Sequence, residues 1–245
     1  MTVRTTLSTA RRVLLQLRRD PRTVAMLLLV PVLLLSLLRG IFDGRPEAFD
    51  SAGGPLLALF PFTMMFLVTS VAMLRERTTG TLERLLATPL GRGDLLAGYA
   101  LAFGGVAVVQ TLIASALALG PLGLDVTGSA VLVVVLAVAS ALLGMALGLL
   151  LSAFAQTEFQ AVQFLPAVVL PQVLLCGLFA PREGMIAPLT WLSDAFPLTY
   201  AVDGMQRVAR SGEVTGRLLA DLAAVAGCAI LALVLGSLTL RRRTA

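Results

Sequence analysis

The sequence predicts an all-α membrane protein with six transmembrane helices. Of its 245 residues, 58% are hydrophobic and only 13% are charged, and the mean hydropathy is +0.92. These values are too apolar for a soluble globular domain. Six apolar segments come close to or exceed the length of about 20 residues that a helix needs to cross a bilayer. We expect the spans at about 23–41, 56–74, 95–119, 130–153, 161–180 and 218–240.

Residues 1–20 precede the first span and have a periodicity of their own. Apolar side chains, among them Leu7 and Leu14, recur at helical spacing on one face. A second, basic stripe holds Arg4, Arg11 and Arg18. The segment is therefore predicted to be an amphipathic helix in the lipid headgroup layer, with a generic cytoplasmic anchor as the alternative. Its apolar run starts too late and lasts too long for a cleavable signal peptide.

Residues 21–245 are expected to form a single six-span transmembrane domain. Asp20 can cap the first span and Pro21 suits its first turn, while Asp94 can cap the third span. Thirteen of the nineteen arginines fall on the side of the membrane that holds both termini. By the positive-inside rule, both termini are predicted to be cytoplasmic, in a bacterial inner membrane.

The connection between the second and third spans, residues 75–99, is predicted to contain a short amphipathic helix. Gly80 permits a break after the second span, Glu83 falls in the first turn, and Pro89 stops the helix. Three leucines share one helical face: Leu82, Leu85 and Leu86. A solvated loop needs no such face, so we expect it to dock onto protein or lipid. The charges alone fit simple positive-inside anchoring equally well.

The last outside connection, roughly 181–217, is unusually apolar. Its residues 185–202 carry prolines and interface-favouring aromatic side chains, namely Pro188, Trp191, Pro197 and Tyr200. No stretch there reaches spanning length, so short re-entrant helices before the sixth span are predicted. A folded external cap above the bilayer is the alternative.

Several side chains inside the spans are candidates for a substrate path. Three glutamines at i, i+4 and i+7 are expected to share one helical face: Gln156, Gln160 and Gln163. They could face the substrate or a partner protomer, or form hydrogen bonds between helices. Four phenylalanines could line a pocket or simply pack: Phe60, Phe62, Phe66 and Phe164. Gly144 and Gly148 form a GxxxG pair that favours close helix packing within one protomer.

Residue types missing from the sequence exclude several kinds of chemistry. All 19 basic residues are arginine, and there is no histidine. Without lysine the chain cannot form a phosphate-binding P-loop, and without histidine it lacks the usual catalytic pairs and His-containing zinc sites. No paired acids lie within a span and both cysteines lie in apolar runs, so we expect neither an enzyme nor a metal centre. Membrane topology explains the net charge of +5 better than a nucleic-acid partner does.

Three segments resemble the permease subunits of ATP-binding-cassette transporters of the type-2 exporter family. They are RRDPRT at 18–23, RERTTGTLERLLATPL at 75–90, and the run containing Gly177, Pro181, Pro188, Pro197, Thr199 and Tyr200. The middle segment is similar to the family's cytoplasmic coupling segment through Glu76-Arg77, Gly80-Thr81, Leu85-Leu86 and Pro89. Within the family, drug exporters of the daunorubicin-resistance kind are the most similar.

The resemblance implies a permease that dimerises, as a homodimer, and binds two copies of a P-loop ATPase subunit. That subunit would hold ATP and Mg, and this chain would carry no cofactor. Three side chains would seat the coupling helix in a cleft of the ATPase: Leu82, Leu85 and Leu86. Five charged ones would orient it by ion pairs: Arg75, Glu76, Arg77, Glu83 and Arg84. The N-terminal helix would brace this joint.

The predicted function is therefore that of the permease subunit of an ATP-driven exporter, moving a drug-like or lipid-like amphiphilic or hydrophobic compound. The span centres lack the charged side chains by which ion-coupled carriers are recognised, which favours energy from a separate subunit. The alternative is a non-transporting membrane anchor or regulator of an ATPase complex.

Overall fold

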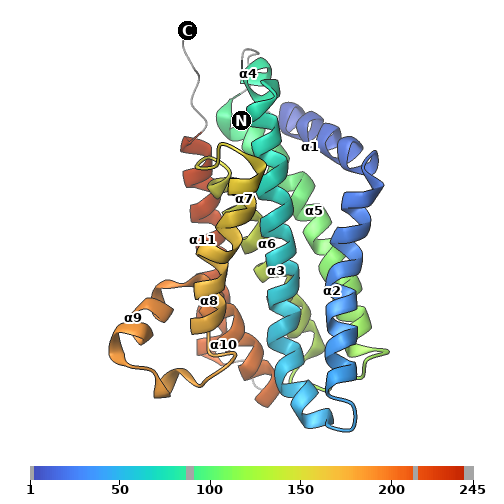
Figure 1. The fold of residues 1–245 in the computed structure, drawn as a ribbon, viewed down its shortest axis with the longest axis vertical. Helices are drawn as coiled ribbons and strands as arrows, with labels where there is room; N and C mark the ends of the chain where they lie inside the picture. Colours follow the sequence, from blue (N-terminus) through green and yellow to red (C-terminus); the bar gives the residue numbers. More distant parts are fainter. Residues whose placement is uncertain (1–2, 87–90, 212–214, 240–245) are drawn as a thin grey trace.

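The computed structural model describes residues 3–86, 91–211 and 215–239, and every regular element in these ranges is helical (Figure 1). Six helices in the described part are long and apolar enough to cross a membrane. They are α2 (Pro21–Ile41), α3 (Pro46–Thr78), α5 (Arg92–Leu119), α6 (Ala130–Leu151), the composite helix Glu158–Leu175 and α11 (Gly216–Leu238). The predicted fold class is confirmed, and the chain is a multi-pass membrane protein.

Helix α1 (Val3–Arg18) precedes the first span and packs against α5 (Figure 1). The two helices approach so closely that a Cβ at Gly98 would come within 2.6 Å of the Thr9 side chain. The chain then turns into α2, whose N-cap Asp20 accepts hydrogen bonds from the backbone N–H of Thr23 at 3.2 Å and from its hydroxyl at 2.6 Å. The helix predicted before the first span and the Asp20 cap are both confirmed.

Helices α3 and α6 cross closely in the centre of the bundle. A Cβ at Gly144 would overlap the backbone carbonyl of Phe62, and one at Gly148 would overlap Phe66 and Thr69. The Thr69 hydroxyl uses this proximity to reach the carbonyl oxygen of Met145 at 3.1 Å. The GxxxG pair therefore packs two helices of one protomer together, as predicted.

The second span is longer than its apolar segment, because α3 begins with Pro46 in its first turn and continues to Thr78. Gly80 then adopts a φ of +71°, which glycine tolerates without strain, and the short helix α4 (Thr81–Leu86) follows. Helix α5 begins at Arg92 with Gly91 as its N-cap. The expected capping role of Asp94 is wrong, because this residue already lies in the first helical turn.

The fifth span is built from α7 (Glu158–Phe164), a π-helical turn (Leu165–Val169) and α8 (Leu170–Leu175). Both of its ends come earlier than in the predicted span 161–180. The start is earlier because Thr157 caps α7, accepting from the backbone N–H of Gln160 at 3.2 Å. The end is earlier because the chain leaves the helix before Gly177, whose φ is +84°.

The early start of α7 also changes the predicted glutamine face. Gln156 precedes the helix, so it does not share a helical face with Gln160 and Gln163, and that prediction is wrong. Its backbone N–H instead donates to the Gln160 side-chain oxygen at 2.8 Å.

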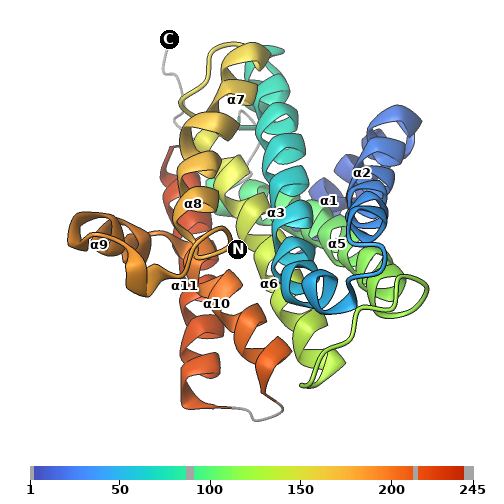
Figure 2. The ribbon, with the colours of Figure 1, turned by 60° about the horizontal axis from the view of Figure 1, so that its bottom comes forward.

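Short helices connect the fifth and sixth spans. A 3₁₀ turn (Arg182–Gly184) leads to α9 (Ala187–Ala195) and α10 (Pro197–Arg210). Helix α10 packs on α11, α3 and α6, whereas α9 stands out from the side of the bundle (Figure 2). Placement of these helices in the outer leaflet remains a prediction.

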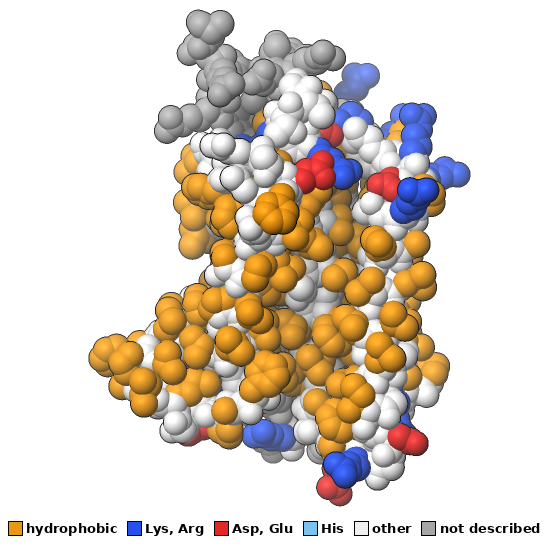
Figure 3. Space-filling model, in the orientation of Figure 1, with side chains coloured by type: hydrophobic (Ala, Val, Ile, Leu, Met, Phe, Trp, Pro, Cys, Tyr) orange, Lys and Arg blue, Asp and Glu red, His pale blue; other side chains and the backbone are white. Residues whose placement is uncertain are grey.

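Charged side chains gather at the two ends of the molecule, with a broad hydrophobic band between them (Figure 3). We call the end with α1, α4 and the last turn of α11 the α4 end, and the end with α10 and the first turn of α11 the α10 end (Figure 1). This distribution is typical of a protein whose hydrophobic band faces lipid.

Candidate functional site

A partly buried polar network joins α1, α3 and α5 at the α4 end. Arg12 Nη1 lies 3.0 Å from Glu76 Oε1, and the Arg12 guanidinium also donates to the Tyr99 hydroxyl and lies over its ring. Gln16 Nε2 donates to the same Glu76 oxygen at 3.3 Å. Burial alone would lower the pKa of Arg12, but the adjacent Tyr99 and Glu76 outweigh it and raise that pKa, so Arg12 stays charged.

Two more arginines of α3 connect it to distant parts of the chain. Arg75 forms a bidentate ion pair with Glu158 of α7, at 2.7 Å and 3.0 Å. Arg77 Nη2 donates to the Thr239 hydroxyl, directly after α11, at 3.3 Å. The end of α3 is therefore tied to α1, α5, α7 and α11 at one level of the bundle.

The leucine face of α4 docks onto the chain itself. Leu82 is only 6% exposed and belongs to the core formed with Leu95 and Tyr99, and Leu85 packs against the same core. Of the two docking surfaces that the sequence left open, protein or lipid, the structure shows protein. Leu82 faces this internal core rather than the outer surface of the molecule.

The charged residues predicted to orient the coupling helix fall into two groups. Arg75, Glu76 and Arg77 make the contacts within the chain described above. The side chains of Glu83, Arg84 and Leu86, and the whole of Pro89, lie outside the described residues. The sequence did not reveal Arg12 and Tyr99 as partners of Glu76, because residues so far apart in the chain give no local signal.

A lateral cavity of about 910 Å³ opens beside this network, between α1, α2, α3, α5 and α7. One face of α3 lines its length, with apolar side chains at Met64, Leu67 and Val71 and charged ones at Arg75 and Glu76. The cavity wall therefore changes from apolar to charged toward the α4 end. We refer to this space as the lateral cavity.

The residues predicted for a substrate path lie elsewhere. Phe62 and Phe66 have no exposed surface and pack with Leu143 and Val169 in the core, and Phe60 and Phe164 are partly buried against core clusters. The glutamines, Gln156, Gln160 and Gln163, are exposed. None of these seven residues is among those that line the lateral cavity.

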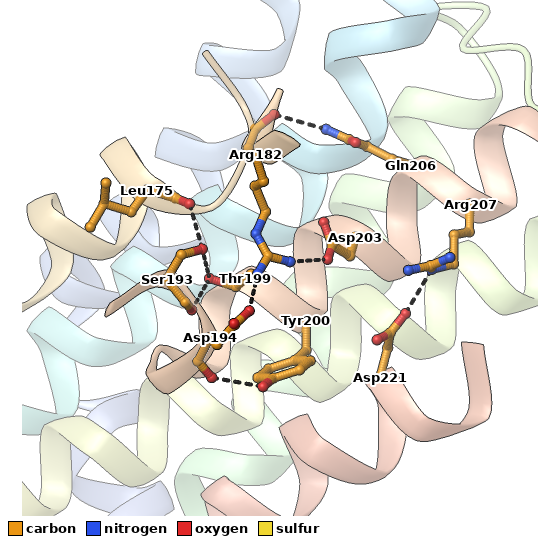
Figure 4. Close-up of polar contacts among 11 residues, drawn as sticks. Leu175, Arg182, Ser193, Asp194, Thr199, Tyr200, Asp203, Gln206, Arg207 and Asp221 are labelled. Atoms are coloured by element: carbon orange, nitrogen blue, oxygen red, sulfur yellow. Dashed lines mark hydrogen bonds and ion pairs between the residues drawn. The ribbon is translucent and has the colours of Figure 1, made fainter. Parts of the chain in front are cut away.

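A second polar cluster lies at the α10 end and is centred on Arg182 (Figure 4). Its guanidinium donates to Asp203 of α10 at 2.7 Å and to Asp194 of α9. The Arg182 side chain is 19% exposed, and burial raises the pKa of Asp203 above its ordinary value despite the arginine beside it. Arg207 and Asp221 form a separate pair at 3.0 Å between α10 and α11.

Hydrogen bonds to backbone carbonyls complete this cluster (Figure 4). Ser193 donates to Leu175 at 2.8 Å, Thr199 to Ser193 at 2.8 Å, and Tyr200 to Asp194 at 2.7 Å. Together they hold the end of α8 to α9 and α10.

The residues predicted for the re-entrant segment are spread over this unit. Gly177 turns the chain after α8, and its carbonyl oxygen accepts from Gln206 at 3.2 Å. Pro181 caps the 3₁₀ turn, while Pro188 and Pro197 occupy first turns of α9 and α10. Trp191 is 73% exposed on α9. Arg182, Asp194 and Asp203 were not predicted as site residues, because their only signal was charge within an otherwise apolar stretch.

A family model described as "ABC-2 type transporter" matches residues 5–209, which cover α1 to α10 and contain both polar clusters apart from Thr239 and Asp221. The chain belongs to the ABC-2 type transporter family. The match includes α4 and the lateral cavity, so these features lie in the part of the chain that the ABC-2 model describes.

Similar curated proteins include ABC transporter proteins of Escherichia coli and of Dictyostelium discoideum. The probable multidrug ABC transporter permease YbhR of Escherichia coli is 31% identical over 60% of this chain and 40% of its own length. YbhS of the same organism, named in the same way, is 25% identical over 72% of this chain and 47% of its own length. ABC transporter G family member 20 of Dictyostelium discoideum is 26% identical over 69% of this chain and 23% of its own length. The chain thus spans less than half the length of these relatives.

Proposed function

We propose that the chain is the permease subunit of an ATP-driven exporter that moves an amphiphilic or hydrophobic compound across the cytoplasmic membrane. The observation that carries this proposal is the ABC-2 match over residues 5–209 of a chain with six spanning helices. The printed names of YbhR and YbhS support the drug-like class of compound. A P-loop needs a lysine and these 245 residues contain none, so we expect a partner ATPase to bind ATP and Mg. We expect two copies of that subunit and a second permease protomer.

In this proposal, the α4 end faces the cytoplasm and α4 receives the movement of the ATPase. Leu82 and Leu85 hold α4 on the permease core, so we assign the ATPase contact to the intervening positions Glu83 and Arg84. Movement of α4 would pass to the end of α3, which Arg75 and Glu76 tie to α7 and α1. Helix α1 would lie at the lipid surface with its basic stripe toward the headgroups.

Vesicle uptake tests the proposal directly. The chain and its ATPase would be reconstituted in lipid vesicles, and ATP-dependent accumulation would be measured over a panel of amphiphilic compounds. A vesicle whose ATPase lacks the P-loop lysine is the matched control. We expect accumulation of at least one compound only with the intact ATPase. ATP hydrolysis that responds to the permease, with no accumulation of any compound, would instead support a regulator or anchor.

A double substitution tests the coupling role of α4. Replacing Glu83 and Arg84 together by alanine should abolish most ATP-dependent uptake while leaving the chain in the membrane. The control replaces Glu183 and Met185 together by alanine, in and directly after the 3₁₀ turn (Arg182–Gly184) at the α10 end (Figure 1). Equal uptake by the α4 variant and the parent would remove α4 from the coupling path.

A further inference from the structure

We propose that a cavity at the α10 end binds the phosphate group of a membrane phospholipid. This space, which we call the α10 cavity, has a volume of about 510 Å³ and shares no lining residue with the lateral cavity. Two observations carry the proposal: arginine N–H groups in the lining that have no acceptor, and an apolar stretch of chain beside them. The inference goes beyond the proposed function, because it concerns a bound lipid and not a transported compound.

The α10 cavity lies between three parts of the chain. Helix α10 contributes four side chains that share one helical face, at i, i+3, i+4 and i+7: Asp203, Gln206, Arg207 and Arg210. The segment 177–183 after α8 and two small residues of α3, Ser51 and Ala52, complete the lining. Gln206 Nε2 connects two of these parts by donating to the Gly177 carbonyl oxygen at 3.2 Å (Figure 4). The volume lies within the range of about 300–1,000 Å³ for small-molecule sites.

Two arginines of the lining have donors without an acceptor. Arg182 uses its two terminal nitrogens on Asp203 and Asp194, but its Nε is buried and has no hydrogen-bond partner among the described residues. Arg210 is exposed and forms no ion pair or hydrogen bond with the described part of the chain. A buried donor without an acceptor is costly, and phosphate oxygens accept charge-assisted hydrogen bonds from guanidinium groups. These donors therefore suit a phosphate.

The charges of the lining favour an anion over a cation. Its three guanidinium groups outnumber its two carboxylates, Asp203 and Glu183. Asp203 already accepts from Arg182 at 2.7 Å, whereas the carboxylate that pairs with Arg207, Asp221, lies outside the lining. Glu183 is exposed, so water and salt screen its repulsion of a bound anion. A phosphate would thus meet more attraction than repulsion.

The apolar part of the lining favours a lipid over a free phosphate. Residues 178–181 line the cavity directly before Arg182 and have the sequence Leu-Phe-Ala-Pro. Phe179 is 70% exposed, and Ile186 and Trp191 are exposed farther along the same segment. A free phosphate would contact only the arginines, whereas a phospholipid would also cover this apolar surface with its acyl chains.

Photo-cross-linking to the purified full chain, without ATPase or ATP, tests this inference. A phosphatidic acid with a diazirine in one acyl chain, next to the glycerol, would be added to the chain in dodecyl maltoside micelles. Mass spectrometry of the peptides would locate the label. The control lipid is the matching diacylglycerol, which lacks only the phosphate.

The two lipids should label the α10 cavity to different extents. Because charge-assisted hydrogen bonds to phosphate are strong, we expect phosphatidic acid to label segment 177–183 or α10 at least about fivefold more than the diacylglycerol does. Equal labelling by the two lipids would overturn the proposal.

Two variants place the site. Arg210→Gln removes an unpaired cation and should lower this labelling at least about threefold, whereas Arg45→Gln, at an exposed arginine that does not line the cavity, should leave it unchanged. Ser51→Trp fills the cavity and should also lower the labelling, with Ser129→Trp before α6 as its control. Thermal unfolding of each variant checks that it is folded. Unchanged labelling in either Arg210→Gln or Ser51→Trp would rule out this cavity.

Glycerol 3-phosphate distinguishes a lipid from a free phosphate ester. Since it lacks acyl chains, we expect about a tenfold excess of it to displace less than about half of the label. Complete displacement would assign the cavity to soluble phosphate esters and overturn the lipid.

The outcome is separable from that of the proposed function, because no step of this experiment uses ATP or an ATPase. Phosphate-dependent labelling without ATP-driven uptake of any compound would support the lipid site and contradict the exporter. Uptake without such labelling would support the exporter and overturn the lipid site.

Discussion

The arginine network at the α4 end and the Arg182 cluster at the α10 end connect segments that lie at different distances along the chain. At the α4 end, Arg12, Arg75 and Arg77 reach partners 64, 83 and 162 positions away. At the α10 end, Arg182 reaches partners 12 and 21 positions away. The polar network at the α4 end therefore ties together helices from the whole sequence, whereas the Arg182 cluster closes one consecutive unit from α8 to α10.

This difference indicates how each end responds to force. If α4 transmits movement as proposed, displacement of the end of α3 would be shared among α1, α5, α7 and α11. The contacts of the Arg182 cluster instead stay within α8 to α10, and α10 also packs on α11, α3 and α6. Substitutions at the two ends should therefore differ in kind, and the following predictions run from the largest expected effect to the smallest.

Removing the arginine of the α10 end should have the largest effect on stability. Arg182→Met leaves Asp203 partly buried without its cation, and breaking a buried pair costs about 3 kcal/mol of unfolding free energy. Chemical denaturation of the purified chain, compared with Glu183→Gln, measures this loss.

The same variant has a pH signature. Because burial raises the pKa of Asp203 in the folded state, its contribution to stability is full below its ordinary pKa and is lost as the pH rises from that value to the raised pKa of the folded state. Loss of Arg182 removes the cation that lowers the pKa of Asp203, so the fall in stability extends to higher pH. The stability deficit of Arg182→Met should therefore be larger at pH 7 than at pH 4.5, and a deficit independent of pH would contradict this explanation.

Widening the α3–α6 crossing should lower the unfolding free energy somewhat less than Arg182→Met does. Because both helices run between the two ends, it should affect both ends together. Gly144→Ala places a methyl group against the carbonyl of Phe62, and overpacking of this kind costs about 2 kcal/mol. Gly105→Ala, where a Cβ meets nothing within 4 Å, is the matched control. Equal thermal stability of the two variants would show that the crossing can relax.

Neutralising the centre of the α4 network should separate stability from transport. Glu76→Gln keeps the shape of the side chain but weakens the charge-assisted bond to Arg12, at a cost of about 1.5 kcal/mol. We expect ATP-driven uptake to fall by a larger factor than stability explains, because α1 and α3 are then less firmly joined. Uptake that follows stability alone would argue against a lever.

The exposed pair of the α4 end should contribute least. Arg75 and Glu158 are 58% and 54% exposed, and exposed ion pairs contribute about 0–1 kcal/mol. A double-mutant cycle with Arg75→Gln and Glu158→Gln should give a coupling energy below about 1 kcal/mol that decreases at high salt. A larger, salt-independent coupling energy would indicate that this ion pair is less exposed to solvent than the structure shows.

Much of the fold could be predicted from the sequence because its signals are local. Apolar length revealed the spans, Asp20 before Pro21 marked the start of α2, and the spacing of Gly144 and Gly148 indicated a close crossing. The fifth span was misplaced because apolar residues continue beyond Gly177, while the backbone of that glycine ends the helix. Apolarity reports solvent preference, not the backbone angle at which a helix stops.

Less of the candidate site could be predicted, because its contacts join distant positions. The leucine face of α4 was evident, but its docking against Leu95 and Tyr99 depends on how the spans pack. Likewise, the sequence indicated charge at Glu76 but not its partner Arg12. The phenylalanines that suggested a pocket instead fill the core, since aromatic side chains serve both uses equally well.

The π-helical turn at Leu165–Val169 separates the two halves of the fifth span. A π-helical turn contains one residue more than an α-helical turn, because its backbone hydrogen bonds join residues five positions apart instead of four. If this turn changed to α-helical geometry, the extra residue would be lost and the part after the turn would rotate by about 100° relative to the part before it. The half anchored by Glu158 could then stay still while the half that leads to Gly177 swivels, giving the chain a built-in rotary joint.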